Sequence, residues 1–143
     1  MSELVVPARV QASAADVEGI TLACRDYVEG WYDAEPDRMR RCLHPDLVKR
    51  TVMRDPESGA WRLRRSTSAE MMVDYTRQGG GSEVQEAERR HQIILDDVFR
   101  HVACARIISP LYVDYVHLAQ VDGRWKLVNV LWELRDGEMG PEE

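Results

Sequence analysis

Two side chains in the last third of the chain could move protons: the carboxyl of Asp114 and the imidazole of His117. An imidazole titrates near neutral pH, and a carboxyl held in a pocket can act as a general base or a hydrogen-bond anchor. Either residue could be the acid-base group of an isomerase or lyase. Each also has a structural explanation, because His117 could be a core or interface histidine and Asp114 an interface or surface carboxylate paired with arginine.

Four aromatic side chains could form walls around such groups, namely Tyr27, Trp31, Tyr115 and Trp132. Tyr27 and Trp31 are four residues apart, which places them on one face of a helix, where they could cover a planar molecule such as a pteridine. The alternative is that these rings pack in the core, which is the commoner role of aromatics at helical spacing.

The stretch Leu111–Leu134 must position most of these residues. Two runs rich in Val, Leu, Tyr and Trp flank Asp122-Gly123, a pattern that favours a β-hairpin with a two-residue turn. The numbers of facing residues then sum to a constant. One side pairs Val113 with Trp132, Tyr115 with Val130 and His117 with Val128, and the other pairs Tyr112 with Glu133, Asp114 with Leu131, Val116 with Asn129 and Leu118 with Leu127.

The two sides of this hairpin differ in polarity. The side with Tyr115, His117 and Trp132 is the more apolar, and a ligand-binding wall needs apolar area with a few orienting polar groups. We therefore assign that side to a cavity and the side with Asp114 and Asn129 to a subunit interface. A register error of one residue would exchange the two faces, so Asp114 remains a candidate for the cavity.

Helices are expected before the hairpin. Ser13 with Asp16, and Thr67 with Glu70, resemble capping boxes, and Pro36 suits the first turn of a helix. With the apolar periodicity that follows, these signals predict helices at about Ala14–Tyr32, Pro36–Leu43 and Thr67–Arg77.

The rest of the chain favours strands. Alternating or apolar runs between turn residues predict strands at Leu47–Arg54, Trp61–Ser66, Arg89–Phe99 and Val102–Ser109, in addition to the hairpin. The last four strands should form an antiparallel meander. The expected fold class is α+β, with three N-terminal helices packed on a strongly curved, mainly antiparallel sheet.

Three blocks of sequence resemble a known family: Tyr27–Tyr32, Leu43–Arg50, and Tyr112–Leu118 with the Asp122–Leu127 that follows. They are similar to the putative lumazine-binding family of the NTF2-like superfamily, whose members include ketosteroid isomerase, scytalone dehydratase and SnoaL-type polyketide cyclases. The resemblance implies a cone-shaped fold with a pocket between the sheet and the first and third helices. From the chain length we expect a single domain over residues 1–143, with residues 1–13 loosely ordered. The strand at Leu47–Met53 lacks the catalytic acid of ketosteroid isomerase, which argues against that chemistry.

Composition excludes several functions. A net charge of -6 argues against general binding of nucleic acid or anionic membranes, and no run approaches the roughly 20 apolar residues of a membrane span. Without a signal-peptide pattern we expect a soluble, cytoplasmic protein. Cys24, Cys42 and Cys104 should be buried apolar residues in a reducing compartment, and no motif predicts a metal or other cofactor.

Three functions remain open. The first is a homodimer that binds a small, flat, partly apolar ligand, such as a pterin-like molecule, inside the cone. The second is an isomerase, dehydratase or cyclase without metal, in which His117 or Asp114 moves the proton. The third is a dimerisation or accessory module without ligand, suggested by the apolar content of both hairpin faces.

Overall fold

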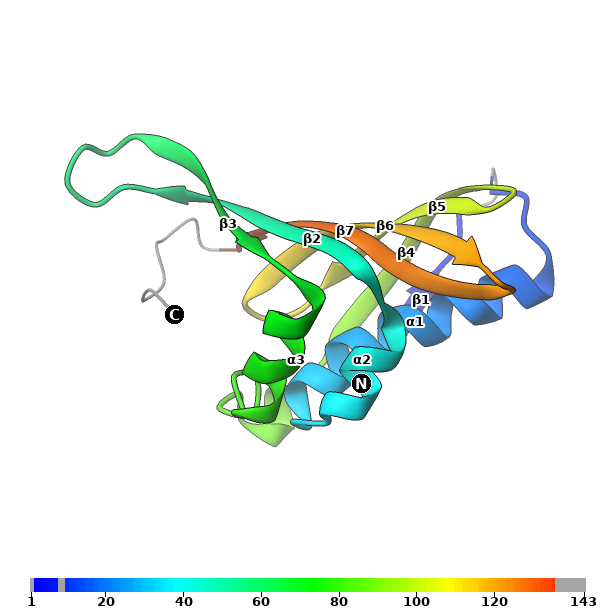
Figure 1. The fold of residues 1–143 in the computed structure, drawn as a ribbon, viewed down its shortest axis with the longest axis horizontal. Helices are drawn as coiled ribbons and strands as arrows, with labels where there is room; N and C mark the ends of the chain where they lie inside the picture. The colour runs from blue at the N-terminus through cyan, green and yellow to red at the C-terminus, as the bar shows by residue number, and fades with distance from the viewer. Residues whose placement is uncertain (1, 8–9, 136–143) are drawn as a thin grey trace.

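The computed structural model describes residues 2–7 and 10–135 of the chain. Figure 1 shows the α-helices gathered on one side of a curved sheet. The predicted α+β fold, with three α-helices on a mainly antiparallel sheet, is confirmed. The elements follow in the order β1 (Ser2–Val5), α1 (Ala14–Tyr32), α2 (Pro36–Cys42), β2 (Leu43–Arg54), β3 (Trp61–Thr67), α3 (Ala69–Arg77), the short 3₁₀-helix η1 (Glu86–Glu88), β4 (His91–Phe99), β5 (Val102–Ile108), β6 (Tyr112–Val121) and β7 (Arg124–Leu134).

Helix α1 has the predicted bounds because its first turn is capped by a side chain. The hydroxyl of Ser13 accepts a hydrogen bond from the backbone N–H of Asp16 at 3.1 Å, which satisfies one of the free donors at the helix start. The helix buries Ile20, Cys24 and Tyr27. It therefore carries Tyr27 to the inner side of the sheet.

A buried carboxylate fixes α2 against α1. Asp26 of α1 is 2 % exposed and accepts hydrogen bonds from Arg38 Nε at 3.0 Å and Arg41 Nη2 at 2.7 Å. Burial alone would raise the pKa of Asp26, but the bonds and charges of Arg41 and Arg38 outweigh it and lower the pKa. This clamp sets the angle at which the chain leaves α2 and enters β2.

The N-cap of helix α3 lies one residue later than predicted. Ser68 is its N-cap, with the hydroxyl accepting a hydrogen bond from the Met71 backbone N–H at 3.2 Å. Thr67, the cap expected from the sequence, is instead the last residue of β3 and is buried. Gly79, two residues after the end of α3, has a φ of 83°, which glycine adopts without strain and which stops the helix from continuing.

The sheet has the strand order β1-β4-β5-β6-β7-β2-β3. Strands β4 to β7 form the predicted antiparallel meander, and β2 lies parallel to β7. Strand β1 pairs in parallel with β4, so the expectation of a loosely ordered segment at 1–13 is wrong for Ser2–Val5. Strand β2 also begins at Leu43 instead of Leu47, with its pairing to β7 interrupted between Leu43 and Val48.

A β-bulge in the β6–β7 hairpin changes which residues face each other. Near the turn the predicted pair of Leu118 with Leu127 is confirmed. Beyond it, Val128 is an extra residue in β7, and the register moves by one. The other predicted pairs are wrong, because Tyr112 faces Leu134, Val113 faces Glu133, Asp114 faces Trp132, Tyr115 faces Leu131, Val116 faces Val130 and His117 faces Asn129.

The bulge also decides which side of the hairpin faces the helices. Asp114, Val116 and Leu118 point inward and are buried, whereas Tyr115 and His117 point outward and are exposed. On β7 the inward positions pass from Leu127 to Val130 without the usual alternation, because the bulge absorbs one residue. The inner side therefore carries Asp114, which a hairpin without the bulge would place on the outer side.

Candidate functional site

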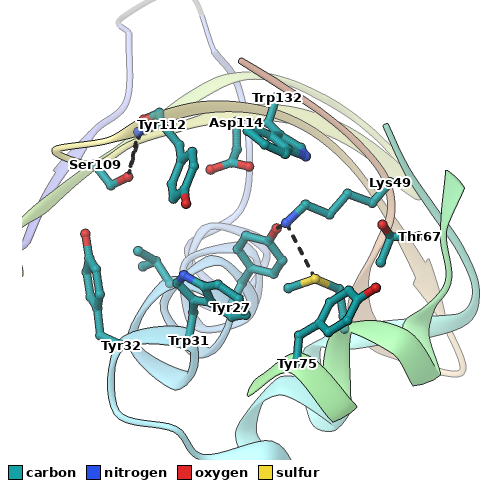
Figure 2. A pocket seen from close by; sticks show the side chains of 12 residues that line it. Tyr27, Trp31, Tyr32, Lys49, Thr67, Tyr75, Ser109, Tyr112, Asp114 and Trp132 are labelled. Atoms are coloured by element: carbon teal, nitrogen blue, oxygen red, sulfur yellow. Dashed lines mark hydrogen bonds between the residues drawn. The ribbon is translucent and has the colours of Figure 1, made fainter. Parts of the chain in front are cut away.

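A pocket lies inside the cone, between the concave side of the sheet and helices α1 and α3. Figure 2 shows its side chains converging from the helices below and from β2, β6 and β7 above. The enclosed space is about 50 Å³, or about 640 Å³ when the space open to solvent is counted. The pocket is lined by Tyr27, Val28, Trp31, Tyr32, Lys49, Thr67, Met72, Tyr75, Ser109, Tyr112, Asp114 and Trp132.

Asp114 is the titratable group at the roof of this pocket. It sits on β6 opposite Trp132 and is 6 % exposed. Burial raises the pKa of its carboxyl to about 6, because the anion loses hydration, while the positive charge of Lys49 acts in the opposite direction. The group therefore changes charge just below neutral pH, where it can both accept and return a proton.

Lys49 of β2 brings a positive charge into the same pocket. Its Nζ donates a hydrogen bond to Tyr27 Oη at 2.6 Å and contacts Met72 Sδ at 3.5 Å. The ammonium also lies 5.2 Å from the ring centroid of Tyr27, 5.7 Å from that of Trp132 and 6.0 Å from that of Trp31. Three aromatic faces thus stabilise the charge where water is scarce.

Lys49 was not predicted as a pocket residue from the sequence. The alternation of β2 contains the missing signal. Thr51 is fully buried and donates a hydrogen bond to the Trp132 backbone carbonyl at 2.8 Å. Lys49 is two residues from Thr51 and therefore shares its inward side.

Aromatic rings make up the walls of the pocket. Tyr112 and Trp132 meet edge to face, with ring centroids 5.1 Å apart and planes at 85°. Trp31 lies on the helical side and packs against the Gly80-Gly81 segment, where an added Cβ would collide with its indole. Tyr112 and Tyr75 were not predicted as pocket residues. Tyr112 was missed because the assumed register placed it on the outer side of the hairpin, whereas Tyr75 of α3 lies outside the hairpin.

Four of the six predicted site residues come together in this pocket, namely Tyr27, Trp31, Asp114 and Trp132. His117 and Tyr115 do not, and their predicted place in the cone is corrected. Both lie on the outer side of β6, with Tyr115 57 % exposed. The physical cause is the bulge at Val128, which moves the partners of both residues by one position.

Other polar side chains on β2 and β3 make structural contacts. The Nδ1 of His44 accepts a hydrogen bond from the Asp46 backbone N–H at 3.0 Å, which stabilises the irregular start of β2. Arg62 pairs with Asp55 across the β2–β3 loop at 3.5 Å. Within residues 2–7 and 10–135, no three His, Cys, Asp or Glu side chains are grouped to hold a metal ion. No helix in that part of the chain is long and apolar enough to cross a membrane.

Comparison with known sequences agrees with this architecture. The sequence model of a family described as "Putative lumazine-binding" matches residues 15–133. The chain belongs to this family. The matched region extends from the start of α1 to β7 and so contains every lining residue of the pocket. A search of curated proteins gave no match.

Solved structures show the same fold. An NTF2-like protein of unknown function from Silicibacter pomeroyi superposes with a TM-score of 0.64 at 11 % identity, covering 87 % of this chain and 100 % of that one. An NTF2-like protein of unknown function from Methylobacillus flagellatus gives 0.63 at 20 % identity, covering 88 % and 97 %. One from Shewanella baltica gives 0.62 at 18 % identity, covering 87 % and 98 %. At these identities the likeness establishes the NTF2-like fold.

Proposed function

We propose that the protein binds a small, flat, partly apolar molecule in the cone, held by Asp114 and Lys49 between aromatic walls. The observation that carries this proposal is the presence of a buried carboxyl and a half-buried ammonium in one pocket, half of whose lining residues are aromatic. Buried charges are costly to maintain, and proteins keep them mainly where they orient a ligand or react.

The chemistry of the pocket favours a heteroaromatic ligand with polar edges. The Lys49 ammonium can donate to a ring carbonyl or an anionic oxygen, and Asp114 can accept from, or when protonated donate to, a neighbouring ring nitrogen. The faces of Trp31 and Trp132 can stack on the ring plane. A pterin-like molecule has this combination, in agreement with the description of the family.

Ligand entry requires the pocket to open. An enclosed space of about 50 Å³ holds a few water molecules, whereas ligand pockets usually measure about 300–1,000 Å³. The segment at Gly79–Gly81 contacts the indole of Trp31, so an outward movement of this segment would free the ring. We expect the ligand to occupy the space vacated by Trp31 and the solvent-filled mouth.

Tryptophan fluorescence can test the binding proposal. Trp31 and Trp132 line the pocket, so a bound pteridine, flavin or steroid should give a saturable change in emission. Asp114→Asn and Lys49→Met should each weaken the affinity about tenfold or more, because a charged hydrogen bond is lost. His117→Gln on the outer side is the control and should leave the affinity unchanged. No saturable change with any ligand class would contradict the proposal.

A second candidate function is acid-base catalysis, favoured by the pKa of about 6 at Asp114. An isomerase or dehydratase could use Asp114 to remove a proton next to a carbonyl, with Lys49 stabilising the negative oxygen that forms. Asp114→Asn would then abolish turnover of a bound carbonyl substrate but retain its binding. Turnover that survives this substitution would exclude Asp114 as the base.

We also propose that the protein forms a homodimer through the part of the outer side of the sheet that extends from β6 and β7 to β3, which leaves β4 and β5 uncovered. Tyr115 faces Leu131 across β6 and β7, and Leu63 and Trp61 continue the apolar surface onto β3. These side chains are 47–61 % exposed, which is unusual for such large apolar groups. Sedimentation should show a dimer that Leu131→Glu dissociates. A monomer at micromolar concentration would contradict the dimer, and a dimer that binds no ligand would favour an accessory module.

A further inference from the structure

A row of polar side chains crosses the outer side of the sheet, away from the cone. Cys104 of β5 faces His117 of β6, and His117 faces Asn129 of β7. Facing residues of antiparallel strands project from the same side of the sheet, with Cβ atoms about 4.5–5.5 Å apart. The thiol, imidazole and amide therefore lie next to one another in that order. The bulge at Val128 creates the row, because an unbulged hairpin would place Val128 opposite His117.

The amide of Asn129 positions the imidazole. Its Nδ2 lies 3.4 Å from His117 Nδ1. A half-turn of the amide puts its carbonyl oxygen at the same place, where it can accept a hydrogen bond from a protonated Nδ1. The other ring nitrogen, Nε2, is then an acceptor that can take a proton from the neighbouring thiol.

A shallow groove surrounds the row. It measures about 400 Å³, and Cys104, His117 and Asn129 all contribute to its surface. The remainder is mostly apolar, including Phe99 at 66 % and Val102 at 55 % exposure. Cys104 is half-buried, so its sulfur is neither sealed in the core nor fully solvated. The sequence-based expectation of a buried, inert thiol does not hold for this cysteine.

The charges near Cys104 act in both directions. Asp97 of β4 faces Cys104, and its carboxylate opposes formation of a thiolate. Arg106, two residues further along β5 on the same side, is bound by Asp96 at 2.8 Å. The group that can promote ionisation is therefore His117, which becomes a positively charged neighbour of the thiolate once it holds the proton.

We propose that Cys104 is a nucleophilic thiol, with His117 as its base and Asn129 as a positioning residue, that captures small apolar α,β-unsaturated carbonyl compounds. The thiol proton passes to the imidazole, and the sulfur forms a bond to the β-carbon of the ligand as the carbon–carbon π bond breaks. The resulting enolate takes the proton back from His117 at the α-carbon. The addition balances without an oxidant, a reductant or a leaving group, and it does not depend on a ligand in the cone.

The other two cysteines provide internal controls. Cys24 is fully buried, and burial raises the pKa of its thiol to about 12. Burial also raises the pKa of Cys42, whose Sγ donates a hydrogen bond to the Met39 carbonyl at 3.2 Å. Neither thiol can ionise or be reached in the folded protein, so a soft electrophile should distinguish Cys104 from both.

N-Ethylmaleimide is a suitable probe, because it is a small apolar conjugate acceptor. We expect the folded full-length protein to gain one adduct by intact mass, located on Cys104 by peptide mapping and absent in Cys104→Ser. His117→Gln should slow the reaction at pH 7 about tenfold or more, and Asn129→Ala severalfold. The pH dependence of the rate should also differ between the wild type and His117→Gln, because only the wild type has a base beside the thiol.

A matched substitution distinguishes activation of the Cys104 thiol by His117 from a general effect of changing a side chain on this surface. Tyr115→Phe lies two residues from His117 on the same side of β6 and should leave the rate unchanged. Equal rates in the wild type and His117→Gln would overturn the proposal. It would also be overturned by first reaction at Cys24 or Cys42, or by a folded protein that gains no adduct while the urea-unfolded chain gains three.

Discussion

The inner and outer sides of the β6–β7 hairpin consist of neighbouring residues but differ in chemistry. On the inner side, the Asp114 carboxyl is buried in a pocket that also holds an ammonium and six aromatic rings. On the outer side, His117 is solvated and lies in line with a thiol and an amide. Burial raises the proton affinity of Asp114, whereas the proposed reactivity of Cys104 arises from its place beside His117 in the sheet.

One extra residue in β7 produces this division. Because Val128 is accommodated as a bulge, Trp132 lies inside opposite Asp114, and Asn129 lies outside opposite His117. Bulges occur often beside functional sites, where they redirect side chains. In this protein the bulge at Val128 determines which side chains of β7 face the cone and which face outward.

The largest effect should come from placing a charge on each side of β6 in turn. Val116→Asp puts a carboxylate into the core at a residue that is 1 % exposed, which should cost more than about 4 kcal/mol and prevent folding. In the Leu131→Glu background, which should be monomeric, Tyr115→Asp lies one residue earlier at a position 57 % exposed in the single chain and should cost less than about 1 kcal/mol. Circular dichroism and urea unfolding would measure both. If Tyr115→Asp is the variant that unfolds, Val116 does not face the core and Tyr115 does not face outward.

The second prediction concerns the stability cost of the Asp114 charge. Its folded pKa is about 6 against an ordinary 3.8, so the folded state binds more protons between these values and loses stability as the pH rises through them. A difference of about two pKa units corresponds to about 3 kcal/mol. Asp114→Asn should therefore unfold at a higher urea concentration than the wild type at pH 7.5, by up to about 3 kcal/mol.

The pH dependence provides the control for this prediction. At pH 4 the wild-type carboxyl is largely protonated in the folded state, and the advantage of Asp114→Asn should almost disappear. Burial lowers the pKa of His91, so its contribution to stability is lost as the pH falls below about 6.5. Both proteins contain His91, so its contribution cancels in their difference. A difference that is constant from pH 4 to 7.5 would show that the charge of Asp114 has no such cost.

The third prediction tests the contact between the glycine segment and Trp31. A Cβ at Gly81 would collide with both the indole and the backbone carbonyl of Trp31, so rotating the side chain cannot relieve the clash. Gly81→Ala should destabilise the protein by about 1–3 kcal/mol and shift the tryptophan emission to longer wavelength. Gln78→Ala, at an exposed position before the segment, should do neither. Unchanged emission in Gly81→Ala would remove the evidence for this segment as the cover of the pocket.

The smallest effect compares two tyrosine hydroxyls. Tyr27→Phe removes the acceptor of the 2.6 Å hydrogen bond from Lys49, which should cost about 1–3 kcal/mol because a charged donor loses its partner. Tyr115→Phe removes an exposed hydroxyl from the outer side and should change the unfolding free energy by less than about 0.5 kcal/mol. Equal effects would mean that Lys49 does not depend on Tyr27.

Much of the fold could be predicted from local signals. The cap at Ser13 and the spacing of apolar residues defined α1, and Pro36 defined the start of α2. The turn at Asp122-Gly123 defined the hairpin, and pairing next to the turn was correct. Strand β1 was missed, because its pairing with β4 joins residues about ninety positions apart and leaves no local pattern.

The site was less predictable because its geometry depends on one bulge. The odd-numbered and the even-numbered residues of β7 are both largely apolar. The first set includes Trp125, Leu127 and Leu131, and the second includes Val128, Val130 and Trp132. The hydrophobic pattern therefore cannot show where the strand changes parity. Lys49 was missed for a related reason, since its alternation with Thr51 indicates an inward side chain only once Thr51 is known to be buried against β7.

A crystal structure of the protein soaked with the tightest ligand from the fluorescence panel would test the central claim most directly. We predict ligand density inside the cone, with polar atoms within hydrogen-bond distance of the Asp114 carboxyl and Lys49 Nζ and with Trp31 displaced. Density confined to the outer groove around His117, or a saturated crystal whose cone remains filled by its own side chains, would contradict the account.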